Sequence, residues 1–291
     1  MEKAMVADDE EERKADMMAR LDMVAVLEAK DIYDSVMSAF PATLGKAVSK
    51  REREELSLKA PALVYGEITF EAFGTVIEKI KKVYGLPGGG HSGPAGVLQS
   101  RGGIFYDLGS GVGKPVIAAA ILHNFDVCYG IEILEGLYSV SLDSLNAYNT
   151  KGKAKLASRE NDTHVQMIQG DFTKTRTKDW RDADIVFANS TCYDEQLMAR
   201  MSSVATGMKK GAFFISLTKR LPSTEFDILE YEMYRMNWGE ATVFIMQKNC
   251  DPSDDAFAQS DSDEEDGLTE GDEEKRNDGQ VEGGREEDEE A

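Results

Sequence analysis

The chain has 291 residues, of which 54 are acidic and 33 basic, so that its formal net charge is -21. Residues 251–291 hold 19 acidic and 3 basic side chains, which leaves a net charge of only -5 on the preceding 250 residues. This balance excludes a protein that clamps nucleic acid with a basic surface of its own, and also a polybasic reader of membrane surfaces.

Three scattered cysteines (Cys128, Cys192 and Cys250) without a CxxC motif fit neither a disulfide framework nor a zinc site, and they favour a reducing compartment. No run of 18 apolar residues occurs, and the first residues lack the apolar core of a signal peptide. We therefore expect an intracellular soluble protein without a membrane anchor.

The amino-terminal third is predicted to be mainly helical. After a disordered acidic start (residues 1–14), a helical region is expected over 15–84, with helices at 15–40, near 46–58 and from Thr69, whose hydroxyl can cap the helix. The segment 85–103 contains 8 glycines and 2 prolines and predicts a mobile surface loop.

Strand-like and helical runs alternate over residues 104–250, which indicates a parallel, doubly wound sheet. The expected strands are Ile104–Leu108, Asp126–Ile131, Val165–Ile168, Ile185–Ala188 and Ala212–Leu217, followed by Phe226–Arg235 and Ala241–Gln247 without a long helix between them. We therefore predict an α/β fold with five parallel strands and an antiparallel carboxyl-terminal hairpin, the seven-stranded, Rossmann-like plan of class I methyltransferases. Residues 251–291 are expected to form a disordered acidic tail, because they are too poor in large apolar residues to form a core.

A glycine-rich turn between a predicted strand and a predicted helix is the sharpest local motif, Asp107-Leu108-Gly109-Ser110-Gly111-Val112-Gly113-Lys114. A phosphate-binding P-loop would need glycine at position 108 and Ser or Thr at position 115, where the chain has Leu and Pro. A dinucleotide fingerprint would need GxGxxG rather than GxGxG. S-adenosylmethionine, whose amino-acid part can lie against bare backbone near a carboxylate, is the remaining ligand. The alternative is a tight turn without a ligand.

Acidic residues follow the next two strands as well. Glu132 comes 23 residues after Gly109 and can accept both hydroxyls of a ribose, and Asp171 can accept an adenine amino group while Phe172 stacks on the ring. Taken singly, Glu132 is as well explained as a solvated acid and Phe172 as a core residue. Together these residues predict a cofactor site at the carboxyl edge of the sheet.

The kind of group that would accept a methyl group from this cofactor is predicted from the segment after the fourth strand, Asn189-Ser190-Thr191-Cys192-Tyr193. The Asn/Asp-Pro-Pro-aromatic tetrad common in enzymes that methylate base amino groups is absent, and His91, His123 and His164 form no pattern suited to an oxygen acceptor. An amine acceptor needs fewer catalytic groups, because desolvation in an apolar channel lowers its pKa and a carbonyl such as that of Asn189 can orient it. The alternative for Asn189 is a strand-end cap.

These motifs, with Val64-Tyr65-Gly66-Glu67 ahead of a helix, Tyr129-Gly130-Ile131-Glu132 and Gly170-Asp171-Phe172, resemble the non-SET histone H3 lysine methyltransferases of the disruptor-of-telomeric-silencing type over residues 60–248. The resemblance implies an enzyme of chromatin regulation that uses S-adenosylmethionine, modifies a core lysine of histone H3 on nucleosomes and resides in the nucleus. It also implies a set of site residues: Tyr65, Gly66, Glu67 and Ile68 over the methionine end, Phe105, Asp107, Gly109, Ser110, Gly111, Gly113 and Lys114 along the cofactor, Glu132 at the ribose, Asp171 and Phe172 at the adenine, and Asn189 and Tyr193 as catalytic positions at the lysine channel.

The chain departs from the family at several positions. The family usually has Gln where this chain has Lys114 and Thr where it has Ile68. Its run Asn-Asn-Phe-Ala-Phe takes the place of residues 189–193, and the tyrosine expected in its final strand is not evident here. An acidic tail stands where some members carry a basic DNA-binding extension, so we expect no strong DNA binding by the chain itself. Two alternatives to histone methylation stay open: methylation of a non-histone protein, and an inactive module that binds histones, for which the acidic tail would attract a basic partner.

Overall fold

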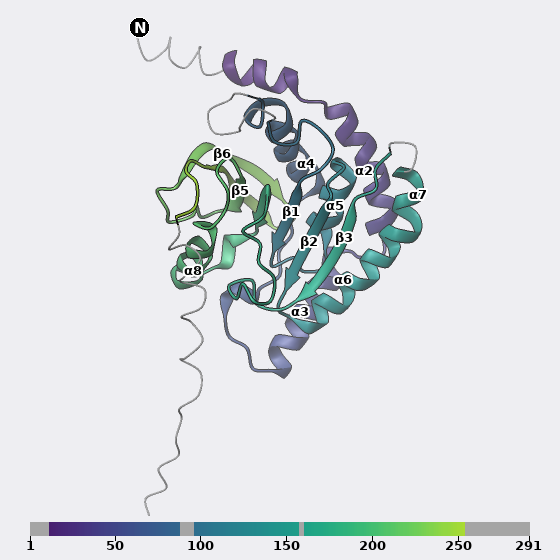
Figure 1. The fold of residues 1–291 in the computed structure, drawn as a ribbon. Helices are drawn as coiled ribbons and strands as arrows, with labels where there is room; N and C mark the ends of the chain where they lie inside the picture. Colours follow the sequence, from purple (N-terminus) through teal and green to yellow (C-terminus); the bar gives the residue numbers. More distant parts are fainter. Residues whose placement is uncertain (1–11, 88–95, 157–159, 254–291) are drawn as a thin grey trace, which may run out of the picture.

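The computed structural model describes residues 12–87, 96–156 and 160–253, and Figure 1 shows how they are arranged. Seven strands form one sheet in the order β3-β2-β1-β4-β5-β7-β6. Their bounds are β1 (Ile104–Leu108), β2 (Val127–Glu132), β3 (His164–Gln169), β4 (Ile185–Ala188), β5 (Phe213–Leu217), β6 (Phe226–Met236) and β7 (Gly239–Lys248). Strands β1 to β5 are parallel, while β7 pairs antiparallel with both β5 and β6. The predicted fold class is confirmed.

Helices precede and connect the strands. The amino-terminal part contains helical residues 12–20, then α2 (Met23–Met37), α3 (Ala42–Glu55), η1 (Pro61–Leu63), α4 (Phe70–Lys79) and the π-helix η2 (Ile80–Tyr84). The sheet part adds α5 (Lys114–Leu122), α6 (Glu135–Ala147), η3 (Tyr148–Gly152), α7 (Lys153–Leu156), η5 (Ser190–Cys192) and α8 (Glu195–Ala205).

Two of the helix starts illustrate the local chemistry. Thr69 caps α4 as predicted, because its hydroxyl accepts a hydrogen bond from the backbone N–H of Ala72. The single helix expected over 15–40 was wrong: Asp22 lies between helical residues 12–20 and α2, and its carboxylate accepts from Ala25 N at 2.9 Å. An aspartate in this position starts a new helix rather than continuing the old one.

The sheet is covered on both faces, so that its central strands are buried throughout. On one face Phe105 and Phe187 pack with α2, α4 and α5, and on the other Tyr106 and Val186 pack with α8 and the buried Trp180. Figure 1 shows α8 on the opposite side of the sheet from α2 and α6. Successive residues of a strand point to opposite faces, and both faces are apolar, as expected for a sheet between two helical layers.

The carboxyl ends of three neighbouring strands finish at the same level. Leu108 of β1 is in register with Ile131 of β2 and with Ala188 of β4. The next residue along each strand, Gly109, Glu132 and Asn189, therefore emerges side by side at one edge of the sheet. In open α/β sheets this is the edge at which ligands bind.

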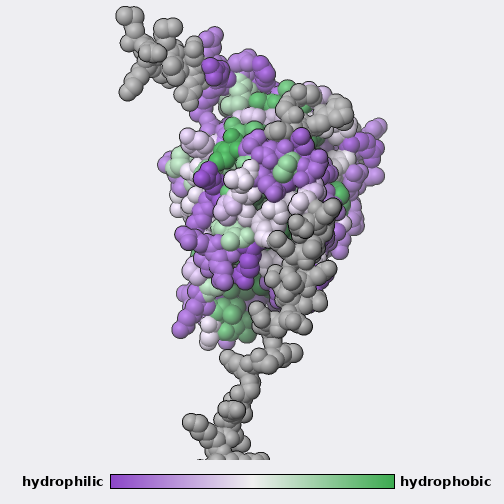
Figure 2. Space-filling model, turned by 60° about the vertical axis from the view of Figure 1, so that its left-hand side comes forward, coloured by the Kyte–Doolittle hydropathy of each residue, from purple (hydrophilic) through white to green (hydrophobic). Residues whose placement is uncertain are grey.

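The β6–β7 hairpin forms the end of the sheet opposite β3, and its outer face is exposed. Tyr231 and Met233 are 69% and 62% exposed, and the Tyr231 ring stacks on Phe244 of β7 with 6.1 Å between the ring centroids. Figure 2 brings this side of the molecule forward and shows a mainly hydrophilic surface with separate small hydrophobic areas. The turn of the hairpin, Asn237-Trp238, lies next to the carboxyl edge of the sheet, since Trp238 lies close to Gly66.

A buried ion cluster joins α4 to β6. Lys79 is only 1% exposed, and its ammonium donates to the carboxylates of Glu230 and Glu232, the latter at 2.7 Å. These contacts raise the pKa of Lys79 although burial opposes its charge, and the Tyr84 hydroxyl also donates to Glu230. The cluster therefore fixes the strand that leads to the hairpin turn.

We expect Lys79→Ala to lower the free energy of unfolding by about 3–5 kcal/mol, because it leaves the buried Glu230 carboxylate without a cation, while Glu232 keeps its ion pair with Lys14. Chemical denaturation measures this loss. Lys50→Ala, which removes an exposed partner of Glu54, is the matched control and should cost less than about 0.5 kcal/mol. An equal loss in both variants would contradict the role given to burial.

Among the described residues no helix is long and apolar enough to cross a membrane. Most of the predicted acidic start, the centre of the predicted glycine-rich loop (88–95) and nearly all of the predicted acidic tail (254–291) lie outside the described residues.

Candidate active site

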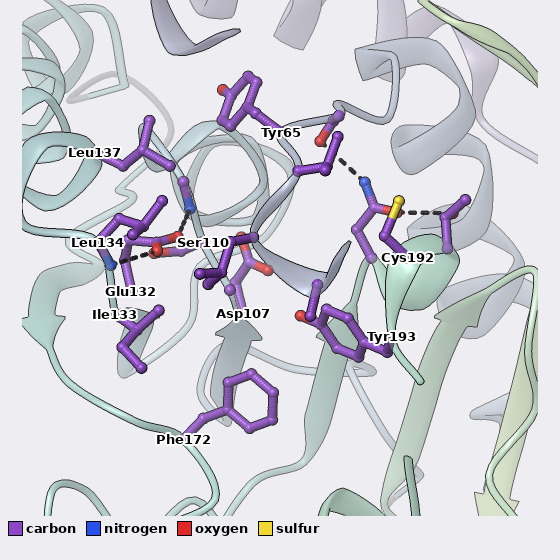
Figure 3. Close-up of a pocket in the computed structure, with 18 of the residues that line it drawn as sticks. Tyr65, Asp107, Ser110, Glu132, Ile133, Leu134, Leu137, Phe172, Cys192 and Tyr193 are labelled. Carbon is purple, nitrogen blue, oxygen red and sulfur yellow. Dashed lines mark hydrogen bonds between the residues drawn. The ribbon is translucent and has the colours of Figure 1, made fainter. Parts of the chain in front are cut away.

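A cavity of about 510 Å³ opens at the carboxyl edge of β1, β2 and β4. Figure 3 shows Glu132, Ile133, Leu134 and Leu137 on one side of it and Cys192 and Tyr193 on the other, with Asp107 and Ser110 between them. Its wall is mostly apolar, and a few polar groups point into it. Cavities of this size and composition are typical of small-molecule sites.

Most of the residues singled out from the sequence meet in this cavity. Its wall includes Tyr65, Gly66, Glu67, Ile68, Asp107, Gly109, Ser110, Gly111, Lys114, Glu132, Asp171, Phe172, Asn189 and Tyr193. Two predicted residues do not line it. Phe105 is fully buried in the core against Phe73 and Phe125, and Gly113 packs under β3. Phe105 lies two residues before Asp107 on the same face of β1, so its side chain lies deeper in the sheet.

The glycines of the loop are needed for different reasons. Gly109, Gly111 and Gly113 have φ values of +85°, +54° and +84°, which side chains other than glycine rarely adopt. A Cβ on Gly111 would stand 2.6 Å from the Tyr65 ring, and one on Gly113 would stand 2.5 Å from Met167. Gly111 therefore keeps the cavity open, whereas Gly113 lets helix α5 pack closely on the sheet.

Asp107 is buried and incompletely bonded. Among the described residues no donor reaches its Oδ2 atom, and the neighbouring Ser110 Oγ also has no partner. Burial, and secondarily the charge of Glu132, hold the pKa of the Asp107 carboxyl well above its usual range. A buried carboxylate without a donor destabilises the empty protein, and a cationic ligand that donates hydrogen bonds would remove that cost.

Glu132 is held in place by the backbone. Its two carboxylate oxygens accept from Gly111 N at 2.8 Å and from Leu134 N at 2.9 Å. Burial raises the pKa of Glu132, while the backbone donors at Leu134, Gly111 and Ile133 act in the opposite direction. A carboxylate offers about four lone-pair sites, so Glu132 keeps capacity to accept from ligand hydroxyl groups.

A network around Glu67 joins three elements at the mouth of the cavity. Glu67 accepts from the Tyr65 hydroxyl at 2.6 Å, from Lys114 Nζ at 2.7 Å and from Asn237 Nδ2 at 3.3 Å. The Lys114 and Glu67 side chains are only 12% and 10% exposed. The network therefore connects the Tyr-Gly-Glu segment to the glycine loop and to the turn of the β6–β7 hairpin.

The predicted catalytic asparagine bridges two sides of the mouth. Asn189 follows β4, and its Nδ2 donates to Gly66 O at 3.0 Å, while its Oδ1 accepts from the Thr191 hydroxyl at 3.0 Å. One lone pair of Oδ1 therefore stays available to a further donor. Trp238 lies on the same side, since its Nε1 would stand 3.1 Å from a Cβ on Gly66.

Tyr193 contributes a ring rather than a reactive hydroxyl. Its hydroxyl is buried and donates to Leu108 O at 2.9 Å, and its ring stacks on Phe172 with 5.8 Å between centroids. Burial raises the pKa of Tyr193, so that the hydroxyl keeps its proton. The geometry gives this side chain a wall position between the loop and Phe172.

We therefore expect Tyr193→Phe to change ligand affinity and turnover by less than about threefold, while the lost hydrogen bond lowers the free energy of unfolding by about 1 kcal/mol. Titration calorimetry and chemical denaturation measure the two quantities. A loss of turnover beyond about a hundredfold would show instead that the hydroxyl takes part in the reaction.

Sequence reasoning missed several residues of the cavity wall, among them Cys192, Ile133 and Trp238. Trp238 is brought to the cavity by the hairpin and lies far along the chain from the other motifs. Its only sequence signal is a large aromatic residue at a turn, between Asn237 and Gly239, where small polar residues are usual. Ile133 is 51% exposed directly after Glu132, and a single exposed apolar residue is common in folded proteins, so no sequence signal marked it.

The strand order, the antiparallel β7 and the cavity beyond the glycine loop define a protein of the class I methyltransferase fold. The family model described as "Histone methylation protein DOT1" matches residues 97–241. Two curated relatives from strains of Cryptococcus neoformans, both named "Histone-lysine N-methyltransferase, H3 lysine-79 specific", are 25% identical over 213 residues, which is 72% of this chain and 26% of theirs. The chain belongs to the DOT1 family of histone methylation proteins, and it spans about a quarter of the length of these relatives.

Solved structures show weaker likeness. TrmN from Thermus thermophilus is 15% identical with a TM-score of 0.41, covering 51% of this chain and 44% of its own. A mutant of MtNAS in complex with S-adenosylmethionine is 14% identical with a TM-score of 0.42, covering 71% of this chain and 74% of its own. Neither similarity bears on the activity of this chain.

Proposed function

We propose that the chain is an S-adenosylmethionine-dependent protein lysine methyltransferase that modifies a lysine in the core of histone H3. The observation that carries the proposal is the buried Asp107 carboxylate, which lacks a donor at one oxygen in a cavity built from the residues of the family motif. The cofactor has what this cavity lacks, namely a cationic amino-acid end that can donate hydrogen bonds. Membership of the DOT1 family supports the same conclusion.

The residues present fit the parts of this cofactor. Asp107 and Ser110 would bind the ammonium end, and Glu132 would accept the two ribose hydroxyls. Asp171 and Phe172 would hold the adenine, Asp171 as an acceptor and Phe172 through its ring, which lines the cavity and already stacks on Tyr193. Lys114 would meet the carboxylate of the amino-acid end, although it now pairs with Glu67.

The acceptor amine would enter beside Asn189 and Trp238. When bound, the cofactor supplies an electrophilic methyl group on a positively charged sulfur. The free lone pair of Asn189 Oδ1 can accept an N–H of the lysine amine and aim its nitrogen lone pair at that methyl group. Holding two reacting groups in line in this way can account for a large part of a rate enhancement.

The amine must lose its proton before it attacks. A lysine in water has a pKa of about 10.4, and an apolar channel lowers it by penalising the ammonium form. The Trp238 ring and the adjoining apolar wall would exclude water from the amine, and the proton would leave to solvent. Tyr193 keeps its own proton and takes no part in this step.

The test is transfer of a labelled methyl group from S-adenosylmethionine to recombinant nucleosomes and to free histones, with mass spectrometry of the labelled protein and Gly111→Arg as the inactive control. We expect label on one lysine of histone H3. Label on another protein of a cell extract, with none on histones, would replace the histone by a non-histone substrate. Cofactor binding by calorimetry without any transfer would favour the inactive histone-binding module.

We also propose that the chain works in the nucleus, where its proposed substrate is found, and that it relies on contacts with histones rather than on strong DNA binding of its own. The near-neutral charge of residues 1–250 supports the second point. Fractionation of cells that express a tagged chain would test the first.

A further inference from the structure

Thr218, the residue after β5, has an unusual backbone conformation. Its φ is +66°, a value that β-branched residues rarely adopt. The N–H of Lys219 donates to Leu217 O at 2.7 Å, which closes a three-residue turn around Thr218. Turns of this kind with a positive central φ are rare and strained, and glycine or asparagine would be the ordinary choice.

The surroundings hold Thr218 in this turn from both sides. The buried Ser190 Oγ donates to Leu217 O at 2.7 Å, and the buried Ser216 Oγ donates to Lys219 O at 2.7 Å. The ammonium of Lys219 also donates to Tyr193 O. Strained residues persist only where neighbouring contacts fix them, and they cluster at functional sites. Two of these three contacts come from the segment 190–193, whose residues Thr191, Cys192 and Tyr193 line the candidate active site.

The hydroxyl of Thr218 starts a hydrogen-bonded chain that ends at the mouth of the cavity. Thr218 Oγ1 lies 3.1 Å from Thr191 Oγ1, which lies 3.0 Å from Asn189 Oδ1. Because Thr191 uses its proton on Asn189, Thr218 must be the donor to Thr191. At the other end Asn189 Nδ2 donates to Gly66 O. All donors point the same way, so the Asn189 amide has one favoured orientation.

We propose that Thr218 is a positioning residue for methyl transfer, which acts through Thr191 to fix the orientation of the Asn189 amide. This inference rests on the proposed function, in which the Asn189 carbonyl meets the acceptor amine. Thr218 does not line the cavity, so any effect on the amine channel must pass through Thr191 and Asn189. The family run has phenylalanine where this chain has Thr191, so the hydroxyl chain is a feature of this protein.

Two substitutions separate the hydroxyl from the shape of the side chain. Thr218→Val keeps the branched shape and removes the donor, and we expect kcat to fall by about threefold to tenfold with little change in KM or in cofactor affinity, because one exposed hydrogen bond is lost. Thr218→Ser keeps the donor and should recover most of kcat. Equal rates for the Val variant and the wild type, or equal losses for Val and Ser, would overturn the proposal.

A double-mutant cycle shows whether the effect passes through Asn189. In an Asn189→Ala background, Thr218→Val should cause no further loss, and in a Thr191→Val background it should cause little, because the chain is already broken. The same loss in every background would overturn the proposal. Thr150→Val, which removes an exposed threonine hydroxyl on η3, is the matched control and should leave kcat unchanged.

Backbone strain offers a readout that does not depend on turnover. Thr218→Gly relieves the strain and removes the hydroxyl, so it should melt at or above the temperature of the wild type and still show the kcat of Thr218→Val. A Gly variant with wild-type kcat would overturn the positioning role. If the wild type binds no cofactor, the proposed function fails; if the wild type transfers methyl groups and the variants do not differ, this inference alone fails.

Discussion

Gly111→Arg should abolish binding of S-adenosylmethionine, with an affinity at least about a hundredfold weaker than that of the wild type. The backbone at Gly111 has φ +54°, and the first atom of any side chain there would stand 2.6 Å from the Tyr65 ring. Tyr65 cannot move aside easily, because Gly45 of α3 lies against its other side, where an added Cβ would be 2.4 Å away. An arginine would therefore displace the ring or fill the cavity.

Titration calorimetry with S-adenosylmethionine measures the loss, and circular dichroism shows whether the variant is folded. Thr150→Arg adds the same side chain at an exposed position of η3 and should bind the cofactor like the wild type. A folded Gly111→Arg protein that kept its affinity would mean that the cofactor does not use this loop.

Asp107→Asn should weaken cofactor binding by roughly ten- to a hundredfold and at the same time make the empty protein more stable. The carboxylate would give the cofactor a charge-assisted hydrogen bond. In the empty protein, however, it is a buried acid with an unpartnered oxygen, and a neutral amide of the same shape avoids the cost of either burying its charge or holding its proton at a raised pKa. We expect a melting temperature about 2–4 °C higher.

The pH dependence of stability comes from the raised pKa of Asp107. Above pH ~4 the unfolded chain has released this proton while the folded chain retains it, so stability of the empty protein falls as pH rises through the raised pKa. Cofactor affinity changes in the opposite direction, because only the carboxylate attracts the cation. Both slopes should be smaller in Asp107→Asn. Identical slopes in the two proteins would assign the titration to another group.

Much of the fold could be predicted because the signals are local. Strands Ile104–Leu108 and Ile185–Ala188 are bounded by turn residues and were predicted with the bounds that the structure has, and Thr69 marked the start of α4. The break at Asp22 was missed because apolar spacing continues on both sides of it. The π-helical ends of α4 and α6 depend on tertiary packing and leave no mark on the periodicity.

The residues of the candidate site also differ in whether local sequence signals could reveal them. Asp107 and Glu132 could be found because each lies at the carboxyl end of a parallel strand, and register alone brings such positions together. Trp238 at the cavity and Asn237, which donates to Glu67, could not, because the β6–β7 hairpin brings them there from far along the chain. Phe105 does not line the cavity, and its proximity along the chain to Asp107 could not show how deep its side chain lies.

A crystal structure of the full chain with the demethylated product, S-adenosylhomocysteine, tests the central claim most directly. We expect its amino group beside Asp107 and Ser110, its ribose hydroxyls on Glu132 and its sulfur facing the opening between Asn189 and Trp238. Density for the ligand in any other place, or in this cavity with its sulfur turned away from Asn189, would contradict the account.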